Sequence, residues 1–401
     1  MSGERLYYTD SYLIEFDAVV RDVQRRDDRW AVTLDRTAFY PTSGGQPFDT
    51  GTLDEARVLD VIEQEDGSVA HFADRELEKN SRVRGNVDWQ RRFDHMQQHT
   101  GQHLLSAAFD RTVAAPTVSF HLGTSSSTID LETVLTPEQI SQVEEAANSI
   151  LWEDREVCVK FVSASEAAKL PLRKEPARTG ELRIIEITDY DLSACGGTHV
   201  RQTGAIGVIQ IAGFERFKGG MRVEFVCGHR ALSAYRALKN CVAGGVRQLS
   251  VLPDEIPSAI ERLQTENRNQ QKSLDAVYER LAVREADALV SAGEKIGAAT
   301  IVAAAVSGWD ATGLKKLASA VASRPGVVAV LMTSESPLIV AASRSQDLSL
   351  DMGVVLKQLI DRFGGKGGGK GSMAQGGGLA GSKQEILDAA KQLLASMVQG
   401  Q

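Results

Sequence analysis

The sequence has few cysteines and no long apolar run, and both absences limit what the protein can be. Only four of its 401 residues are cysteines, and they are scattered: Cys158, Cys195, Cys227 and Cys241. Such scatter favours free thiols or metal ligands in a reducing compartment over a disulfide framework. The N-terminal stretch MSGERLYYTDSYLIEFD carries early charges, and no segment is apolar for long enough to be a signal peptide or to cross a bilayer. The sequence therefore predicts a cytoplasmic protein.

Net positive charge is also missing. The formal net charge is −8, so bulk electrostatics does not attract this chain to nucleic acid, and any nucleic-acid site must be local. Basic clusters such as Arg91 with Arg92 are each more typical of a solvated face than of a phosphate track. With 401 residues, 42% of them hydrophobic, the chain can bury two or three separate cores.

Two familiar catalytic signatures are absent as well. The stretch GGKGGGKGSMAQGGG fails as a P-loop, because neither Lys366 nor Lys370 is followed directly by Ser or Thr. This excludes a nucleoside triphosphate site and leaves two hypotheses for the loop: a flexible linker, or a mobile cationic loop whose bare backbone approaches RNA phosphates. Neither His95 nor His99 is followed by glutamate, so the HExxH pattern of zinc peptidases is also excluded.

The chain divides into three regions with different residue patterns. From Tyr12 to about Trp89, short β-rich runs separated by turn residues predict a small antiparallel barrel or sandwich. From Asp94 to about Cys227 the pattern is α+β, with a histidine-bearing helix and a second helix opened by Thr136-Pro137-Glu138. The strands ELRIIEIT, AIGVIQI and MRVEFV follow in this region and are expected to share a core with the helices.

The last third begins with a stretch that lacks glycine, from Val246 to Ala292. Apolar residues there recur at alternating steps of four and three, which predicts a helical arm, either a coiled coil or a hairpin packed on its neighbours. They are Ile256, Ile260, Leu263, Leu274, Val277 and Leu281. Beyond the arm, buried strands alternate with helices at about 311–323 and 350–363, which predicts a C-terminal α/β domain with a further helix at about 382–397.

The seven histidines are distributed unevenly. His95, His99 and His103 are spaced by four, so on a helix they share one face, and imidazoles one turn apart can bind a single ion. Cys195 and His199 form a CxxxH pair whose two intervening glycines allow a tight turn toward the same ion. Three or four N/S ligands suit Zn²⁺. The spacing leaves open which histidine stays outside the set, and whether a full set is structural or catalytic.

These motifs carry a family resemblance. The pair HTGQH and CGGTH resembles the HxxxH and CxxxH motifs of the alanyl-tRNA synthetase editing domain and its freestanding AlaX relatives. Upstream, PTSGGQPFDTG is similar to the glycine-rich motif of the family's N-terminal barrel, and GGKGGGKGSMAQGG is similar to the tail of its C-terminal domain. The resemblance implies an α+β multidomain chain: barrel at 1–90, editing domain of the threonyl/alanyl-tRNA synthetase second-additional-domain type at 91–250, helical arm at 251–293, and C-terminal α/β domain at 294–401.

The resemblance also implies a function. The expected reaction is zinc-dependent trans-editing without aminoacylation: hydrolysis of the ester that joins a wrong amino acid to tRNA(Ala), serine first and glycine second. Such an enzyme is needed because an alanine pocket cannot strongly reject an isostere with one extra hydroxyl. The family's zinc ligands map onto four residues, His99, His103, Cys195 and His199. His95 falls outside the motif.

Other site residues implied are less specific. Candidate partners for the serine hydroxyl are Thr42, Ser43, Gln46, Thr117 and Ser119, although such residues are usually turn formers. Candidate tRNA contacts are Arg222, Lys366 and Lys370, with the alternative that Arg222 pairs with Glu224 or another acid on the sheet. A homodimer through the C-terminal domain is a further expectation. The acids before CGGTHV, including Asp191, are interpreted as turn or surface residues.

Two alternatives stay open. The zinc can be structural in a tRNA-binding adaptor without hydrolysis, or the enzyme can edit another aminoacyl-tRNA, as the similar domain of the threonyl enzyme does for serine. Deacylation assays on Ser-tRNA(Ala) and Ser-tRNA(Thr) separate these hypotheses.

Overall fold

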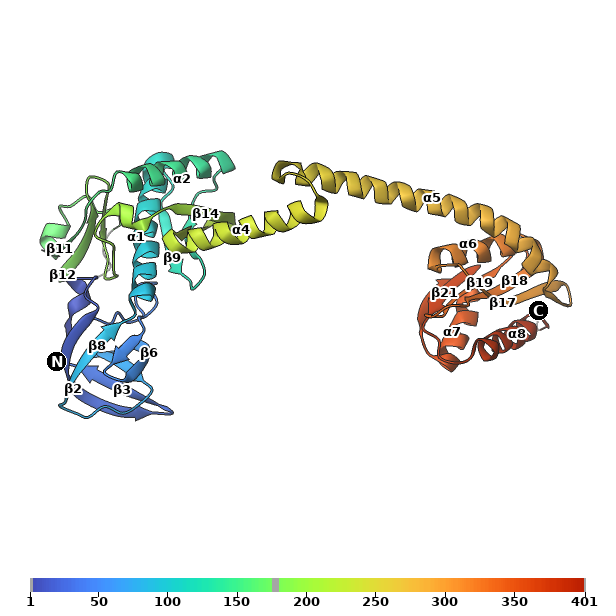
Figure 1. Cartoon of the computed structure of the whole chain (residues 1–401), viewed down its shortest axis with the longest axis horizontal. Helices are drawn as coiled ribbons and strands as arrows, with labels where there is room; N and C mark the ends of the chain where they lie inside the picture. Colours follow the sequence, from blue (N-terminus) through green and yellow to red (C-terminus); the bar gives the residue numbers. More distant parts are fainter. Residues whose placement is uncertain (1–2, 175–179, 400–401) are drawn as a thin grey trace. The chain divides into compact units, whose positions relative to one another are not determined.

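The computed structural model describes residues 3–174 and 180–399, which form two compact units, Met1–Gly244 and Gly245–Gln401 (Figure 1). Within these described residues, no helix combines the length and the apolarity that a membrane span requires. The finer division into four domains remains a prediction. Each unit is described by itself below.

The first unit begins with a closed antiparallel barrel of strand order β2-β3-β7-β6-β5-β8, so the barrel alternative is confirmed over the sandwich. The burial along β8 alternates strictly, as expected for strands with one face toward a core and one toward water. Phe16, Phe39 and Leu53 lie in that core. The barrel strands are β2 (Glu15–Arg26), β3 (Arg29–Leu34), β5 (Gly51–Leu53), β6 (Ala56–Glu63), β7 (Val69–Ala73) and β8 (Arg82–Val87), beside a short pair β1 (Glu4–Arg5) and β4 (Arg36–Thr37).

The α+β part of the first unit is organised around α1 (Trp89–Val113), which packs against α2 (Pro137–Trp152). Thr136 is the N-cap of α2 and Pro137 its first residue, as predicted, and Gln139 completes a capping box with Thr136. Two sheets complete this part: β14-β15-β10-β9, and β11-β12-β13. Their bounds, with the remaining helices, are β9 (Thr117–Leu122), β10 (Ser127–Leu131), β11 (Val157–Ser163), α3 (Ala164–Ala167), β12 (Glu181–Ile187), β13 (Asp191–Ala194), β14 (Ile209–Phe217), β15 (Gly220–Cys227) and α4 (Gly228–Leu249).

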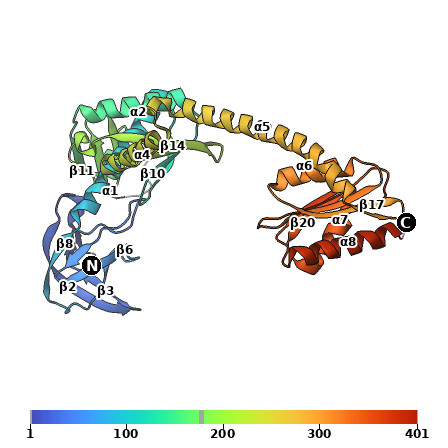
Figure 2. The same cartoon turned by 45° about the vertical axis from the view of Figure 1, so that its right-hand side comes forward.

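The second unit is the predicted α/β domain. A mixed sheet of order β16-β17-β18-β19-β21-β20 has α6 and the end of α5 on one face and α7 and α8 on the other (Figure 2). The bounds are α5 (Ile256–Ser291), β16 (Glu294–Ile296), β17 (Ala299–Val306), α6 (Ala311–Ala322), β18 (Val327–Thr333), β19 (Ile339–Arg344), α7 (Met352–Phe363), β20 (Lys366–Lys370), β21 (Met373–Gly377) and α8 (Lys383–Gln399).

The prediction of a glycine-rich loop at this end of the chain was wrong. Residues 366–377 form the hairpin β20–β21, with Lys366 paired to Gly377 and Lys370 to Met373. Glycine permits this close pairing, because a Cβ on Gly369 would lie 2.3 Å from the Cα of Ala374. Both lysines are exposed, at the two ends of an edge strand.

The predicted helical arm is one continuous helix, α5. Its apolar seam does not pack as expected within the described residues: Ile260 is 44% exposed and Leu263 is 48% exposed. Ala282 and Ala286 are buried instead, in the core cluster that also contains residues of α6. Small side chains at these two positions let the helices approach each other closely, which a count of large apolar residues does not detect.

Candidate metal centre and its pocket

Helix α1 positions two of the four candidate ligands. Asp88 caps its first turn by accepting a hydrogen bond from the backbone N–H of Arg91, and Ala114 ends the helix in the left-handed region at φ 51°. His99 and His103, one turn apart, are both buried. The helix is unusual because most of its buried residues around this point are polar, and Gln97, Gln98 and Thr100 bond to groups on other segments.

The other two ligands lie on the loop that follows β13. The guanidinium of Arg183 donates to the carbonyl oxygens of Cys195 (2.7 Å) and Gly197 (2.9 Å), which fixes the turn of this loop. Gly197 is required by space, since a Cβ there would lie 2.1 Å from Cε1 of His99. At Gly196, by contrast, the nearest atom would be the Tyr8 hydroxyl at 3.7 Å. The loop therefore reaches the histidine helix only because position 197 has no side chain.

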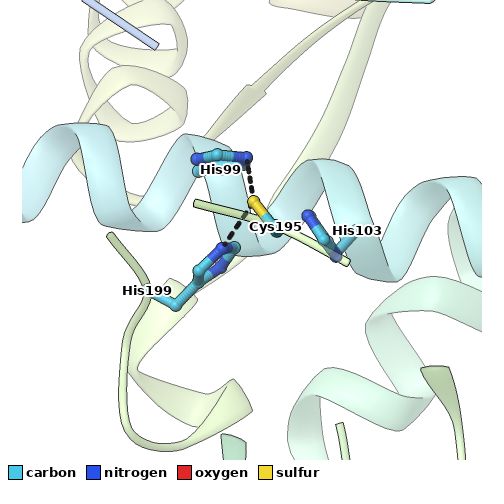
Figure 3. Close-up of side chains that lie close together, drawn as sticks. All are labelled: His99, His103, Cys195 and His199. Carbon is cyan, nitrogen blue, oxygen red and sulfur yellow. Dashed lines mark hydrogen bonds between the residues drawn. The ribbon is translucent and has the colours of Figure 1, made fainter. Parts of the chain in front are cut away.

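The four side chains converge (Figure 3). One ligand atom from each of His99, His103, Cys195 and His199 lies within 4.8 Å of all the others. The sulfur of Cys195 is 3.3 Å from Nε2 of His99 and 3.4 Å from Nε2 of His199. Segments almost a hundred residues apart in the sequence thus form one cluster.

Each imidazole is oriented by a partner on its other nitrogen. His99 Nδ1 donates to Oε1 of Gln46 at 2.8 Å, and His103 Nδ1 donates to Oδ2 of Asp191 at 3.2 Å. His199 Nδ1 lies 3.2 Å from Oγ1 of Thr100. The amide and carboxylate oxygens on His99 and His103 can only accept, so they place the Nδ1 proton and leave Nε2 facing the cluster, while the Thr100 hydroxyl positions the ring of His199.

The electrostatics of the cluster favour a thiolate. Burial acts to raise the pKa of Cys195, but the neighbouring imidazoles of His99 and His199 outweigh it and hold that pKa well below its usual value. Burial acts to lower the pKa of His103, yet its hydrogen bond to Asp191 raises it to about 9. Burial lowers the pKa of His199 to about 3. Thiolate and neutral imidazole are the forms that bind metals, and the lowered pKa values of Cys195 and His199 favour both forms. His103, with its raised pKa, has to release a proton when it binds a metal ion.

This donor set fits a metal ion. One thiolate and three imidazoles form a set suited to Zn²⁺, and tetrahedral bonds of about 2.0 Å to nitrogen and about 2.3 Å to sulfur imply N···S separations of about 3.5 Å. The observed separations of 3.3 and 3.4 Å agree with that geometry. The cluster can bind a metal without rearrangement of its backbone.

The cluster lies at a pocket of about 550 Å³, whose lining includes the side chains of His99, His103 and Cys195. Of the predicted serine partners, Ser43, Thr117 and Ser119 line it. The Thr117 hydroxyl donates to Oγ of Ser106, and that of Ser119 donates to Asp130. Gln46 is fully buried against His99 and Thr198. Thr42 is exposed, and its hydroxyl accepts from the N–H of Phe48.

Of the other residues considered from the sequence, His95 and Arg222 lie away from the cluster within the first unit. His95 is buried in a separate cavity of about 600 Å³, which His229 and Arg230 also line. Arg222 forms a two-fold hydrogen bond to Asp130, at 2.7 and 2.9 Å, so it pairs with an acid of the sheet other than Glu224. Lys366 and Lys370 lie in the second unit.

Sequence reasoning missed two buried ion pairs. Asp191, interpreted as a turn or surface acid, is 5% exposed and bonds to both His103 and Arg173. Arg92, interpreted as part of a solvated face, is fully buried and donates to Asp49 at 3.0 and 3.1 Å, which joins α1 to the barrel loop. The one available signal was position: Asp191 lies four residues before Cys195, and Asp49 three residues after Gln46.

Comparisons with known proteins cover the whole chain. Three family models match: tRNA synthetases class II (A) at residues 6–91, the threonyl and alanyl tRNA synthetase second additional domain at 182–224, and the DHHA1 domain at 298–396. A solved structure, the C-Ala domain of *Aquifex aeolicus* alanyl-tRNA synthetase, covers 26% of this chain and 97% of its own at 23% identity and a TM-score of 0.24, too small a likeness to bear on the fold.

Curated relatives give the stronger result. Alanine–tRNA ligases of *Methanoregula boonei* and *Natronomonas pharaonis* are each 33% identical to the chain, which spans only 41% and 44% of their lengths. The alanyl-tRNA editing protein AlaX-L of *Pyrococcus horikoshii* is 32% identical over 99% of both chains. That relative is matched from end to end, so the chain belongs to the AlaX-L family of alanyl-tRNA editing proteins.

Proposed function

We propose that this protein is an aminoacyl-tRNA deacylase that hydrolyses mischarged tRNA(Ala), serine first and glycine second, and that it lacks aminoacylation activity. The observation that carries the proposal is the convergence of three imidazoles and one thiolate at a pocket large enough for an aminoacyl ester. Family membership supports the tRNA(Ala) substrate, since the end-to-end relative is named an alanyl-tRNA editing protein.

We assign zinc to the cluster, held by Nε2 of the three histidines and by Sγ of Cys195. When bound, the ion supplies positive charge at the pocket wall, where the ester and amino groups of the substrate are polar. Gln46, Asp191 and Thr100 hold the three rings in place through their Nδ1 atoms. The burial of these partners keeps bulk water from competing for their hydrogen bonds.

The remaining residues of the proposal bind the tRNA. Lys366 and Lys370 are exposed cations at the ends of β20, where the neighbouring glycines leave the backbone open to a phosphate group. Contacts of this kind neutralise phosphates without reading sequence, so they add affinity for tRNA in general. Arg222 is not included in this role, because its guanidinium already donates two hydrogen bonds to the carboxylate of Asp130.

The test is release of serine from Ser-tRNA(Ala) by the purified protein, with the metal content measured by elemental analysis. We expect one zinc per chain and hydrolysis well above the spontaneous rate, both lost in His103→Ala. The matched control is His121→Ala, because His121 is an exposed histidine on β9 outside the cluster. That variant should keep its metal and its activity.

Two results would reject the proposal. If the wild-type protein binds tRNA in a gel-shift assay but releases no serine, it is an adaptor with a structural metal. If Ser-tRNA(Thr) is hydrolysed faster than Ser-tRNA(Ala), the enzyme edits another aminoacyl-tRNA. A protein purified without chelators that contains no metal would remove the zinc assignment.

A further inference from the structure

The pocket beside the cluster has an unusual concentration of unsatisfied polar atoms. Among the described residues, six buried side-chain atoms lack a hydrogen-bond partner, and three of them belong to residues that line this pocket. These three atoms are Oη of Tyr7, Oε1 of Gln102 and Nη2 of Arg183. Because buried polar groups in folded proteins are nearly always bonded, such a group of exceptions indicates a polar ligand.

Gln102 is the one of the three that lies beside the metal-binding histidines. It is on α1 three residues after His99, which places the two on neighbouring turns of one side of the helix, and Gln102 lines the pocket together with His99 and His103. Its side chain is 3% exposed. Its amide Nε2 donates to Oγ of Ser106 at 2.9 Å, and Thr117 donates to the same oxygen at 2.9 Å. This chain of bonds orients the amide and leaves Oε1 as a free acceptor.

Several other polar side chains of the pocket are already engaged within the protein. The Ser119 hydroxyl donates to Asp130, Lys174 donates to the carbonyl of Val118, and Arg173 donates to Asp191. Glu63 accepts from Arg5. Within the described part of the pocket wall, Gln102 therefore provides the buried carbonyl acceptor that has no partner.

We propose that Gln102 determines the specificity of the pocket, with its Oε1 accepting a hydrogen bond from the hydroxyl of a seryl group. The inference rests on the proposed function and adds the residue that reads the substrate. A pocket that admits serine cannot exclude alanine by size, because alanine is the smaller side chain. A buried acceptor solves this problem, because alanyl and glycyl groups leave it unpaired and pay for its desolvation without a hydrogen bond in return.

The test compares kcat/KM for Ser-tRNA(Ala) and Gly-tRNA(Ala) in the wild type and in Gln102→Met, which keeps the length of the side chain but removes the acceptor. The ratio of seryl to glycyl activity should fall roughly 10- to 100-fold, because only the seryl group loses a hydrogen bond in the variant. The matched control is Gln90→Met, the same substitution at an exposed position of α1 outside this pocket. It should keep the wild-type ratio.

A second variant and a second readout protect the test from misfolding or loss of activity. Ser106→Ala removes the bond that orients the amide and should lower the ratio by a smaller factor. Affinities for non-hydrolysable seryl and glycyl 3′-aminoadenosine measure the same discrimination without catalysis. In the wild type the seryl analogue should bind more tightly, and in Gln102→Met the two should become nearly equal.

Equal losses for seryl and glycyl substrates would overturn the inference, because they would place the carbonyl at the ammonium group that both share. An unchanged ratio in Gln102→Met with full metal content would overturn it too. Failure of the proposed function has a different signature: the wild type would hydrolyse neither substrate. If the seryl and glycyl analogues then bound equally, the inference about Gln102 would be rejected together with the proposed function. If the seryl analogue still bound more tightly, Gln102 would remain the residue that recognises serine in a binding site without hydrolysis.

Discussion

Helix α1 in the first unit and strand β18 in the second are both buried along much of their length, but their compositions are opposite. The buried residues of α1 include arginine, threonine, several glutamines and the histidines, whereas β18 buries six apolar residues and Thr333. Burial of polar groups costs free energy unless each one is bonded, so α1 needs a network that β18 does not. Buried polar groups that could bind a metal ion or a substrate are therefore numerous on α1, whereas β18 contributes only Thr333 to its core.

The dense packing around the polar groups of the first unit can be tested at single glycines. The largest effect is expected at Gly197, on metal affinity. Gly197→Ala places a methyl group onto the ring of His99 and near Oε1 of Gln46, at 2.1 and 2.9 Å. We expect metal affinity to fall about 100-fold or more, the upper range for changes that disturb the supports of a ligand. Competition with a chromogenic chelator measures this.

Gly196→Ala is its control, because the added methyl group would have 3.7 Å of space to the Tyr8 hydroxyl. Equal losses in the two variants would mean that backbone freedom, rather than contact with His99, is what position 197 requires.

Histidine content predicts a difference in acid sensitivity. All seven histidines lie in the first unit, and burial lowers the pKa of His71 in the barrel to about 4. Its Nδ1 donates to the carbonyl of Val32 and its Nε2 accepts from Thr37, so only the neutral ring fits. The folded pKa lies below the unfolded one, so stability is present above about pH 6.5 and is lost as pH falls toward 4.

Between pH 7 and pH 5 this one histidine should cost the first unit about 2 kcal/mol. Hydrogen exchange followed by mass spectrometry reports each unit separately, and protection should fall in the first unit but much less in the second. His71→Gln does not titrate, so its pH dependence should be shallower than that of the wild type. An identical slope in the variant would assign the acid sensitivity to other groups.

The smallest expected effect is in the second unit, at the glycine hairpin. Gly369→Ala would bring a methyl group to 2.3 Å from Cα of Ala374, while at Gly368 nothing lies within 4 Å. We expect Gly369→Ala to destabilise the second unit by about 1 kcal/mol or slightly more, and Gly368→Ala to have little effect. Thermal unfolding of the two variants decides the matter, and equal stabilities would show that the hairpin opens at little cost.

Much of the fold could be predicted because its signals are local. Short β-rich runs between turn residues predicted the barrel, the start signal Thr136-Pro137-Glu138 predicted α2, and short apolar runs predicted the sheet of the second unit. The hairpin at 366–377 was missed because glycine usually indicates flexibility. Residues 366–370 form a strand only through their pairing with residues 373–377. The seam of α5 is exposed in the single chain, so its coiled-coil alternative stays a prediction, because periodicity does not tell whether a partner is present.

The site divides in the same way. Donor atoms and their spacing were enough to propose a metal site from the histidine helix and the CxxxH pair, but only the family resemblance selected His99, His103, Cys195 and His199 and left His95 out. Asp191, Gln46 and Gln102 could not be assigned their contacts, because a carboxylate or an amide has no spacing rule that identifies its partner. Gln46 was selected for substrate and lies instead against His99.

The amino-acid sequence by itself determined the element types, the family and the donor atoms of the candidate metal centre, because each of these depends on residue identity and short-range periodicity. Only the tertiary structure decided which polar groups are paired. It buried Arg92 with Asp49, joined His103 to Asp191, and left Oε1 of Gln102 without a partner. Hydrogen bonding between distant segments depends on distances and desolvation that exist only after the chain has folded.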